Sequence, residues 1–259
     1  MDSGVPATLP PLTRRLLGWE IIVVFAVSLG ASALFAVINL IGSLTAPKAL
    51  RQQQALLVGS LAPGRPLLDL TLQLAGIITT LAPVALVFYL LAREGERPSA
   101  LGIDTTRPGS DLARGTVLAA VIGGSGLALY IAAFHLGISL NVVPENLPAI
   151  WWRFPVLVLD AAQNGILEEV LVLGYLLRRL DQLGWAPGKA IALAAVVRGS
   201  YHLYQGFGGF IGNAILGVIF GVLYKRWGRV TPMIIAHTLI DAGAFVGYAV
   251  LHGHVSWLP

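Results

Sequence analysis

Two adjacent carboxylates, Glu168 and Glu169, lie in the stretch GILEEVLVLGYLLRRL, which is otherwise almost entirely apolar up to its basic end. A charged side chain at the centre of a bilayer costs about 2.5–3.5 kcal/mol on insertion scales. Two neighbouring charges therefore need partners within the protein, and such residues often have a function. Successive helical residues turn by about 100°, so Glu168 and Glu169 point in different directions and need separate partners.

Further polar residues continue this pattern within the same predicted helix. Asp160, Asn164 and Glu168 follow one another at intervals of four, so they drift by only ~40° per step and form one stripe. Gln163 lies beside the stripe. Such a stripe on a membrane helix most often faces the bundle interior or a water-filled cavity. The alternative is that both glutamates only hold helices together through hydrogen bonds.

Two later predicted helices each carry a histidine four residues from a charged side chain. Arg198 and His202 have this spacing in AVVRGSYHLYQG. His237 and Asp241 have it in PMIIAHTLIDAG. Residues four apart share one helix face. A single histidine on an apolar helix is more often a structural core residue than a catalytic one, but here three helices carry such groups.

Helix geometry predicts that the three groups meet at one depth. Measured from the basic residue near the end of each helix, Glu168, His202 and His237 lie ~15, ~20 and ~12 Å along their helices, at 1.5 Å per residue. We therefore expect them to form roughly one layer near the middle of the membrane.

This layer has the chemistry of a hydrolase. A carboxylate and an imidazole in a low-dielectric pocket can together hold and deprotonate a water molecule, which is general-base catalysis. A second histidine with a nearby Asp or Asn can donate hydrogen bonds to a developing oxyanion. Glu168, His202 and His237 could alternatively bind zinc, and the sequence does not separate the two routes. The chain has no H-E-x-x-H, G-x-S-x-G or G-x-G-D motif of other intramembrane hydrolases.

The composition predicts a polytopic membrane protein. The 259 residues are 56% hydrophobic and 12% charged, and the mean hydropathy is +0.77, whereas soluble domains are nearer one quarter charged. The absence of cysteine excludes disulfides, thiolate chemistry and Cys-ligated metals. The net charge of +4 does not indicate nucleic-acid binding, because the basic residues cluster at the ends of the apolar runs.

Apolar runs predict an all-α transmembrane bundle of about seven spans. The runs cover roughly 17–44, 67–93, 115–139, 155–177, 188–205, 209–226 and 230–251, and about 20 residues are needed to cross ~30 Å of hydrocarbon. The polar site is expected between the fourth, fifth and seventh spans. We expect the first to be an uncleaved anchor, because its apolar run continues past the Ala31-Ser32-Ala33 cleavage-like sequence to about Leu44. The segment 45–66 is predicted to hold a short interfacial helix.

The predicted organisation has four parts. These are an N-terminal cytoplasmic tail (1–16), N-terminal transmembrane helices (17–153) with a cytoplasmic loop (94–114), a catalytic core (154–251) and a short C-terminal tail (252–259). In the sixth span, Asn213 is expected to form an interhelical hydrogen bond. Glycines of the same span are expected at close helix contacts; these are Gly208, Gly212, Gly217 and Gly221.

The distribution of basic residues predicts a cytoplasmic N-terminus and an outer C-terminus, because basic loops face the cytoplasm. The cytoplasmic side would hold Arg14, Arg15, Arg93, Arg97, Arg107, Arg114, Arg178, Arg179, Lys189, Lys225, Arg226 and Arg229. The other side would hold only Lys48, Arg51, Arg65 and Arg153. Arg198 falls inside a span.

The ordered motifs EExxx(R)G, xxxH and HxxxD/N on three late helices resemble the CPBP family, also called CAAX proteases and bacteriocin-processing enzymes or Abi. These are intramembrane glutamic endopeptidases related to the eukaryotic CAAX prenyl protease. The resemblance covers about residues 155–245. It implies that Glu168 activates the water, that His202 helps to hold it, and that His237 and Asp241 polarise the scissile carbonyl. An ionised Asp cannot donate a hydrogen bond, so Asp241 is either protonated in its apolar site or orients His237.

Two positions depart from the family pattern. The arginine usual four residues after the second glutamate is Leu173, although Gly174 follows as expected, and the usual phenylalanine before the second-motif histidine is Arg198. The missing arginine would neighbour Glu169. Our hypothesis is that Arg198 supplies this charge from the adjacent helix, so that Glu169, Arg198 and Asn164 support the catalytic residues. The alternative, that Arg198 snorkels to an interface, is disfavoured by its position in the middle of the span.

The sequence therefore predicts an endopeptidase of a bacterial cell membrane that acts on a membrane-associated peptide or protein. Its expected partners are the lipid bilayer and this substrate, without nucleic acid and without a cofactor; zinc held by Glu168, His202 and His237 is the alternative. The rival function is a non-catalytic immunity or scaffold protein of the same fold that binds a peptide or partner. A transporter is disfavoured because the chain shows no inverted repeat.

Overall fold

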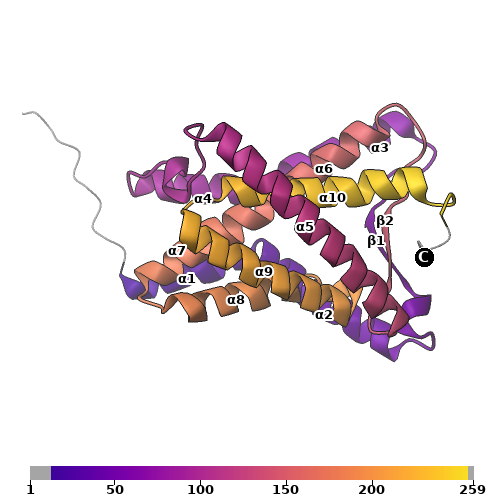
Figure 1. The fold of residues 1–259 in the computed structure, drawn as a ribbon, viewed down its shortest axis with the longest axis horizontal. Helices are drawn as coiled ribbons and strands as arrows, with labels where there is room; N and C mark the ends of the chain where they lie inside the picture. The colour runs from indigo at the N-terminus through magenta and orange to yellow at the C-terminus, as the bar shows by residue number, and fades with distance from the viewer. Residues whose placement is uncertain (1–12, 256–259) are drawn as a thin grey trace, which may run out of the picture.

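The computed structural model describes residues 13–255 and confirms an all-α bundle, to which one two-stranded sheet is added (Figure 1). The elements are, in order, α1 (Arg14–Ala26), α2 (Leu29–Thr45), η1 (Leu50–Gln52), β1 (Gln54–Val58), α3 (Pro66–Thr80), α4 (Ala82–Arg93), η2 (Pro98–Leu101), α5 (Pro108–His135), β2 (Asn141–Glu145), α6 (Arg153–Glu168), η3 (Glu169–Leu176), α7 (Leu177–Gln182), α8 (Pro187–Ser200), η4 (Leu203–Gln205), α9 (Phe207–Trp227) and α10 (Thr231–Leu251). Segment η3 is a π-helix, and the other η elements are short 3-10 turns.

The protein is an integral membrane protein, and some of the predicted spans are long and apolar enough on their own to be candidate membrane-crossing helices. Within residues 13–255, four helices are long and apolar enough: Pro66–Arg93, Pro108–His135, Phe207–Trp227 and Thr231–Leu251. The pair α1 and α2 makes a fifth if its bend is counted as one span. The runs 155–177 and 188–205 are not among these helices. Helix α8 has only 14 residues, and the continuous helical run of α6, η3 and α7 carries the charged residues Asp160, Glu168 and Glu169.

The first span bends instead of running straight as expected. Helices α1 and α2 meet at 54°, where the Ser28 hydroxyl donates to the carbonyl of Val24 at 2.6 Å, a bond that tends to bend helices. Gly30 follows, and a Cβ there would lie 2.5 Å from the carbonyl oxygen of Phe25. The bend lines a cavity of about 470 Å³ together with Thr79 at the break between α3 and α4. Irregular backbone within a membrane is tolerated where it lines such a cavity.

The short helix predicted in 45–66 is present only as the three residues of η1, and its position at the membrane interface stays a prediction. This segment has a single 3-10 turn followed by β1, which pairs with β2 in parallel, with Ala55 opposite Val142 and Val58 opposite Glu145. The hydroxyl of Tyr130 accepts a hydrogen bond from the Val142 N–H at 3.0 Å. The chain leaves α2 and α5 at the same end of the bundle. There β1 and β2, which follow these helices, lie side by side (Figure 1).

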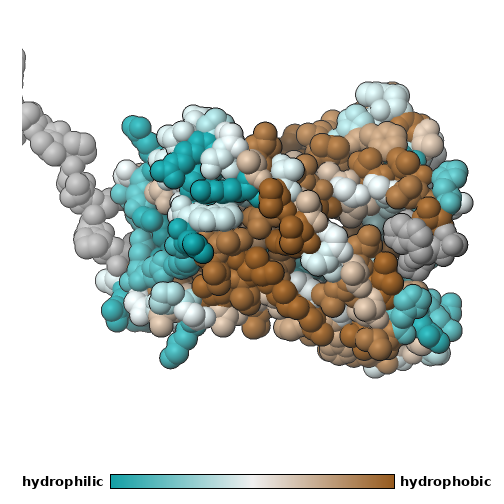
Figure 2. All heavy atoms as spheres, in the orientation of Figure 1, coloured by the Kyte–Doolittle hydropathy of each residue, from teal (hydrophilic) through white to brown (hydrophobic). Residues whose placement is uncertain are grey.

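Basic residues that were assigned to the cytoplasmic side gather at the opposite end of the bundle. Arg179, which is fully buried, pairs with Glu20 of α1 at 2.8 Å and with Glu94 after α4 at 2.6 Å. Arg178 pairs with Glu96. Figure 2 shows hydrophilic residues over this end and a brown apolar surface beside it. The grouping matches the predicted topology, and the assignment of this end to the cytoplasm stays a prediction.

A second ion-pair cluster at this end holds the turn between α9 and α10 against α5. Arg229 lies 2.6 Å from a carboxylate oxygen of buried Asp111 and 3.0 Å from one of Asp104. Hydrogen bonds from Arg229 and Thr106 lower the pKa of Asp104 below its ordinary value, so this carboxylate stays ionised at neutral pH. A group whose pKa is lower in the folded state stabilises the fold above its ordinary pKa and loses this effect as the pH falls.

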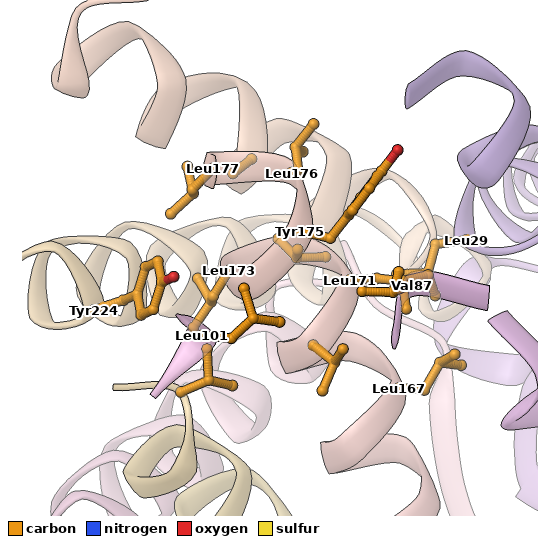
Figure 3. Packing of buried hydrophobic residues seen from close by; sticks show 14 of the residues in the cluster. Leu29, Val87, Leu101, Leu167, Leu171, Leu173, Tyr175, Leu176, Leu177 and Tyr224 are labelled. Carbon is orange, nitrogen blue, oxygen red and sulfur yellow. The ribbon is translucent and has the colours of Figure 1, made fainter. Parts of the chain in front are cut away.

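The core of the bundle surrounds η3, every residue of which is buried. Figure 3 shows side chains of η3 and α7 enclosed by apolar residues of α2, α4, η2 and α9. Leu173, at the position of the missing arginine, belongs to this apolar cluster with Leu101 and Tyr224.

The glycines of α9 make close helix contacts as expected, but Asn213 does not form the interhelical hydrogen bond that was expected of it. A Cβ at Gly217 would lie 2.9 Å from the Cα of Ala195 in α8, and one at Gly221 would lie 3.0 Å from Ile191. The Asn213 amide donates to the carbonyl of Gly209 in its own helix at 3.1 Å, so the expected interhelical bond is absent from the described contacts of Asn213.

Arg229→Ala should lower the free energy of unfolding by about 3–5 kcal/mol, because it leaves the buried Asp111 carboxylate without its partner. Lys225→Ala is the matched control, because its pair with half-exposed Asp181 should contribute only about 0–1 kcal/mol. Thermal unfolding in detergent compares the two variants. Equal stability of Arg229→Ala and Lys225→Ala would contradict the role of this cluster.

Candidate active site

The two glutamates lie where α6 passes into η3, and they face different partners. Glu168 is the last residue of α6 and Glu169 the first residue of the π-helix. π-Helical turns are rare and often occur at functional sites. Both side chains are turned into the bundle, since Glu168 is 8% exposed and Glu169 is fully buried.

Glu169 is paired with Arg198 from the adjacent helix, in agreement with the hypothesis drawn from the sequence. Arg198 of α8 places Nη1 2.7 Å from Glu169 Oε1, and both side chains are fully buried. The same oxygen lies 2.7 Å from Nδ1 of His237 in α10. Arg198 does not snorkel to an interface. A buried carboxylate without a partner would strongly destabilise the fold, and Arg198 supplies this partner to Glu169.

The two carboxylate oxygens of Glu168 have different neighbours. Its Oε2 accepts a hydrogen bond from the Tyr201 hydroxyl at 2.7 Å and lies 3.5 Å from Arg198 Nη2. Its Oε1 lies 3.9 Å from Nε2 of His202. This distance is too long for a direct hydrogen bond, and separations of this kind are commonly bridged by water. The sequence indicated Tyr201 as a residue that could line the pocket, but not that it is a direct partner of Glu168.

The spacing of four residues predicted that Arg198 and His202 share one helix, but His202 lies beyond the end of α8. Helix α8 ends at Ser200, and His202 occupies the turn before η4. Its Nδ1 nevertheless lies 3.0 Å from the Arg198 carbonyl oxygen, which can only accept a hydrogen bond. Nδ1 therefore carries the hydrogen, and Nε2 of the neutral ring is left as an acceptor that faces Glu168.

His237 has carboxylates on both sides of its ring. Nδ1 lies beside Glu169, and Nε2 lies 3.5 Å from Oδ2 of Asp241. The Asn164 amide donates to the same Asp241 oxygen at 3.3 Å. Carboxylates thus face both ring nitrogens, and Asp241 lies where it can orient His237 through Nε2. The predicted spacing of four within α10 thus brings His237 and Asp241 together.

The site has an accessible layer and a sealed layer. The side chains of Glu168, His202 and Asp241 are 11%, 13% and 23% exposed. Those of Glu169 and Arg198 are fully buried. The first set can reach a ligand or water, whereas the ion pair lies behind it and can act only through its neighbours.

A close contact of α6 with α10 sets the separation of these groups. At Gly165, a Cβ would lie 2.7 Å from Oγ1 and 3.0 Å from the backbone nitrogen of Thr238, and 3.1 Å from the carbonyl oxygen of Ile234. The two backbones therefore approach each other through this glycine, which lies three residues before Glu168, while Thr238 lies three residues before Asp241.

The zinc alternative fits this arrangement poorly. No group of three His, Cys, Asp or Glu side chains in residues 13–255 is placed to hold a metal ion. The Arg198 guanidinium lies 3.5 Å from Glu168 and 3.0 Å from His237 Nδ1, so a cation already lies among the proposed ligands. A zinc ion bound here would be repelled by the positive charge of Arg198 at close range.

Carboxylates and imidazoles converge here inside a helical membrane bundle, an arrangement that can support hydrolysis. Residues 150–243 match the family model described as Type II CAAX prenyl endopeptidase Rce1-like. This match confirms the resemblance to the CPBP family of CAAX proteases over this part of the chain. Searches of curated proteins and of solved structures gave no match.

Gly165→Ala should reduce peptidase activity by about 100-fold, because it pushes α10 away from α6 and displacements near 1 Å have costs of this size. It should destabilise the fold by only about 1–3 kcal/mol. Gly243→Ala on α10 is the control, since a Cβ there meets no atom within 4 Å. Cleavage rates per folded molecule compare the variants. Full activity of Gly165→Ala would contradict the proposed spacing of the site.

Proposed function

We propose that the protein is an intramembrane endopeptidase in which Glu168 and His202 activate a water molecule to hydrolyse a peptide bond. The observation that carries this proposal is the gap of 3.9 Å between Glu168 Oε1 and His202 Nε2. Both atoms are acceptors, given the hydrogen on Nδ1 of His202. A water molecule that donates one hydrogen to each would direct its lone pairs away from both, toward a bound carbonyl carbon.

In the first step, the water oxygen bonds to the carbonyl carbon while Glu168 takes a proton from the water. The carbonyl oxygen becomes an oxyanion, which accepts a hydrogen bond from Nε2 of His237. Asp241 supports this donor from 3.5 Å and is itself fixed by Asn164. In the second step, the C–N bond breaks and Glu168 returns its proton to the leaving amine.

The substrate is proposed to be a peptide or protein segment held at the membrane. The matching family model names CAAX prenyl endopeptidases, so a quenched fluorescent peptide with a C-terminal CAAX sequence is a suitable probe, with and without a prenyl group. We further propose a multi-pass bacterial membrane protein with a cytoplasmic N-terminus, on the distribution of basic residues.

Glu168→Gln should reduce cleavage by at least about 1,000-fold, because the amide keeps the shape of the side chain but cannot accept the proton. The measurement is cleavage of the quenched peptide in vesicles, with expression and thermal unfolding as controls. A variant that folds normally and keeps wild-type function would favour the rival function, a peptide-binding immunity or scaffold protein.

Treatment with EDTA, followed by its removal, should leave cleavage unchanged if the glutamate route operates without a metal. Loss of cleavage that is restored by zinc alone would instead support the alternative in which Glu168, His202 and His237 bind zinc.

A further inference from the structure

Arg198 contacts both glutamates and a histidine at once. Its Nη1 lies 2.7 Å from Glu169 Oε1, and its Nη2 lies 3.5 Å from Glu168 Oε2 and 3.0 Å from His237 Nδ1. Its Cζ lies 5.5 Å from the centre of the Phe220 ring on α9, within the range of a cation–π contact. One rigid side chain on α8 thereby joins α6, η3, α9 and α10.

These contacts decide which atoms of Glu168 and His237 face a substrate. Arg198 and the Tyr201 hydroxyl occupy Oε2 of Glu168, so Oε1 is left to receive the proton of the water. On His237, Arg198 and Glu169 both lie beside Nδ1, so Nε2 is the nitrogen that points away from the ion pair, toward Asp241 and the accessible layer.

Arg198 also holds His202, but through its backbone. The carbonyl oxygen of Arg198 accepts from Nδ1 of His202 at 3.0 Å. This contact does not depend on the identity of the side chain at 198. The two histidines therefore differ in a way that an experiment can use, because only His237 should respond to a side-chain substitution.

We propose that Arg198 is the positioning residue of the catalytic centre and fixes the reactive oxygen of Glu168 and the donor nitrogen of His237. It performs this role although it does not touch the substrate, since it is fully buried behind the accessible layer. Within the described residues, it is the one arginine or lysine paired with either glutamate. Leu173, where the family pattern has its arginine, is sealed in the apolar cluster instead. The role in catalysis rests on the proposed function.

The first test compares Arg198→Lys and Arg198→Met with the same substitutions at Arg179. Arg179 is the matched control, because it is also fully buried between two glutamates but lies at the end of the bundle, outside the site. A lysine keeps the charge but has a single ammonium in place of the planar fork. In folded Arg198→Lys, kcat should fall by about 100-fold with little change in KM, and the pH profile should shift.

The Arg179 variants should fold in lower yield, while the molecules that fold keep the wild-type kcat and pH profile. Arg198→Met should lower kcat further than Arg198→Lys if it folds, and Arg198→Lys alone decides the test if it does not. An Arg198→Lys variant with the kcat and pH profile of the Arg179→Lys variant would overturn the proposal.

A second test does not depend on peptidase activity. Nitrogen-15 spectra of histidine-labelled protein in lipid, assigned with His202→Gln and His237→Gln, report the hydrogen on each ring nitrogen. Arg198→Lys should move the His237 signals and leave those of His202 in place. Unchanged His237 signals would overturn the proposal. If the wild-type protein cleaves no peptide but its His237 signals shift as expected, the proposed function fails and the positioning by Arg198 stands.

Discussion

The structure depends on the placement of one buried cation beside two adjacent carboxylates inside an apolar bundle. Glu168 and Glu169 together carry more charge than a membrane interior tolerates alone, and the cation that compensates it comes from a different helix, at Arg198. The separation of α6, α8 and α10 is consequently set by electrostatics as well as by packing. The close contacts at Gly165 and Gly217 agree with this requirement, because they let the helix backbones approach far enough for the side chains to meet.

Buried charges are also paired at the end of the bundle, but there the ion pairs lie outside the site. Arg179 and Arg229 are each held by two carboxylates from other segments. Their partners come from α1, α4 and α5 and the loops beside them, so these clusters tie the N-terminal helices to the family segment at 150–243. No partner of Arg179 or Arg229 belongs to the site. The ion pairs at the end of the bundle serve the scaffold, whereas the pair at Arg198 borders the accessible layer of the site.

Much of the site could be predicted from sequence because its spacing is local. The pairing of His237 with Asp241 follows from helix periodicity, and the contact between Arg198 and Glu169 follows from the need of a buried charge for a partner. Helix periodicity could not show that α8 stops before His202, since the chain turns there through contacts with distant residues. The Tyr201 contact to Glu168, the bend near Ser28 and the pairing of β1 with β2 depend likewise on tertiary geometry. The substrate and the roles of the site residues stay predictions.

The π-helical segment η3 makes the length of this stretch more important than its composition. Its apolar side chains fill a sealed core in which Leu, Ile and Val can often replace one another at modest cost. A chain shortened by one residue here would change the turns between α6 and α7, so α7 would shift in rotation and depth relative to α6. That rotation would carry Arg178 and Arg179 away from their acidic partners while Glu168 stayed in place. Evolution of this segment is therefore expected to exchange its aliphatic side chains for others of similar volume but to admit insertions and deletions rarely.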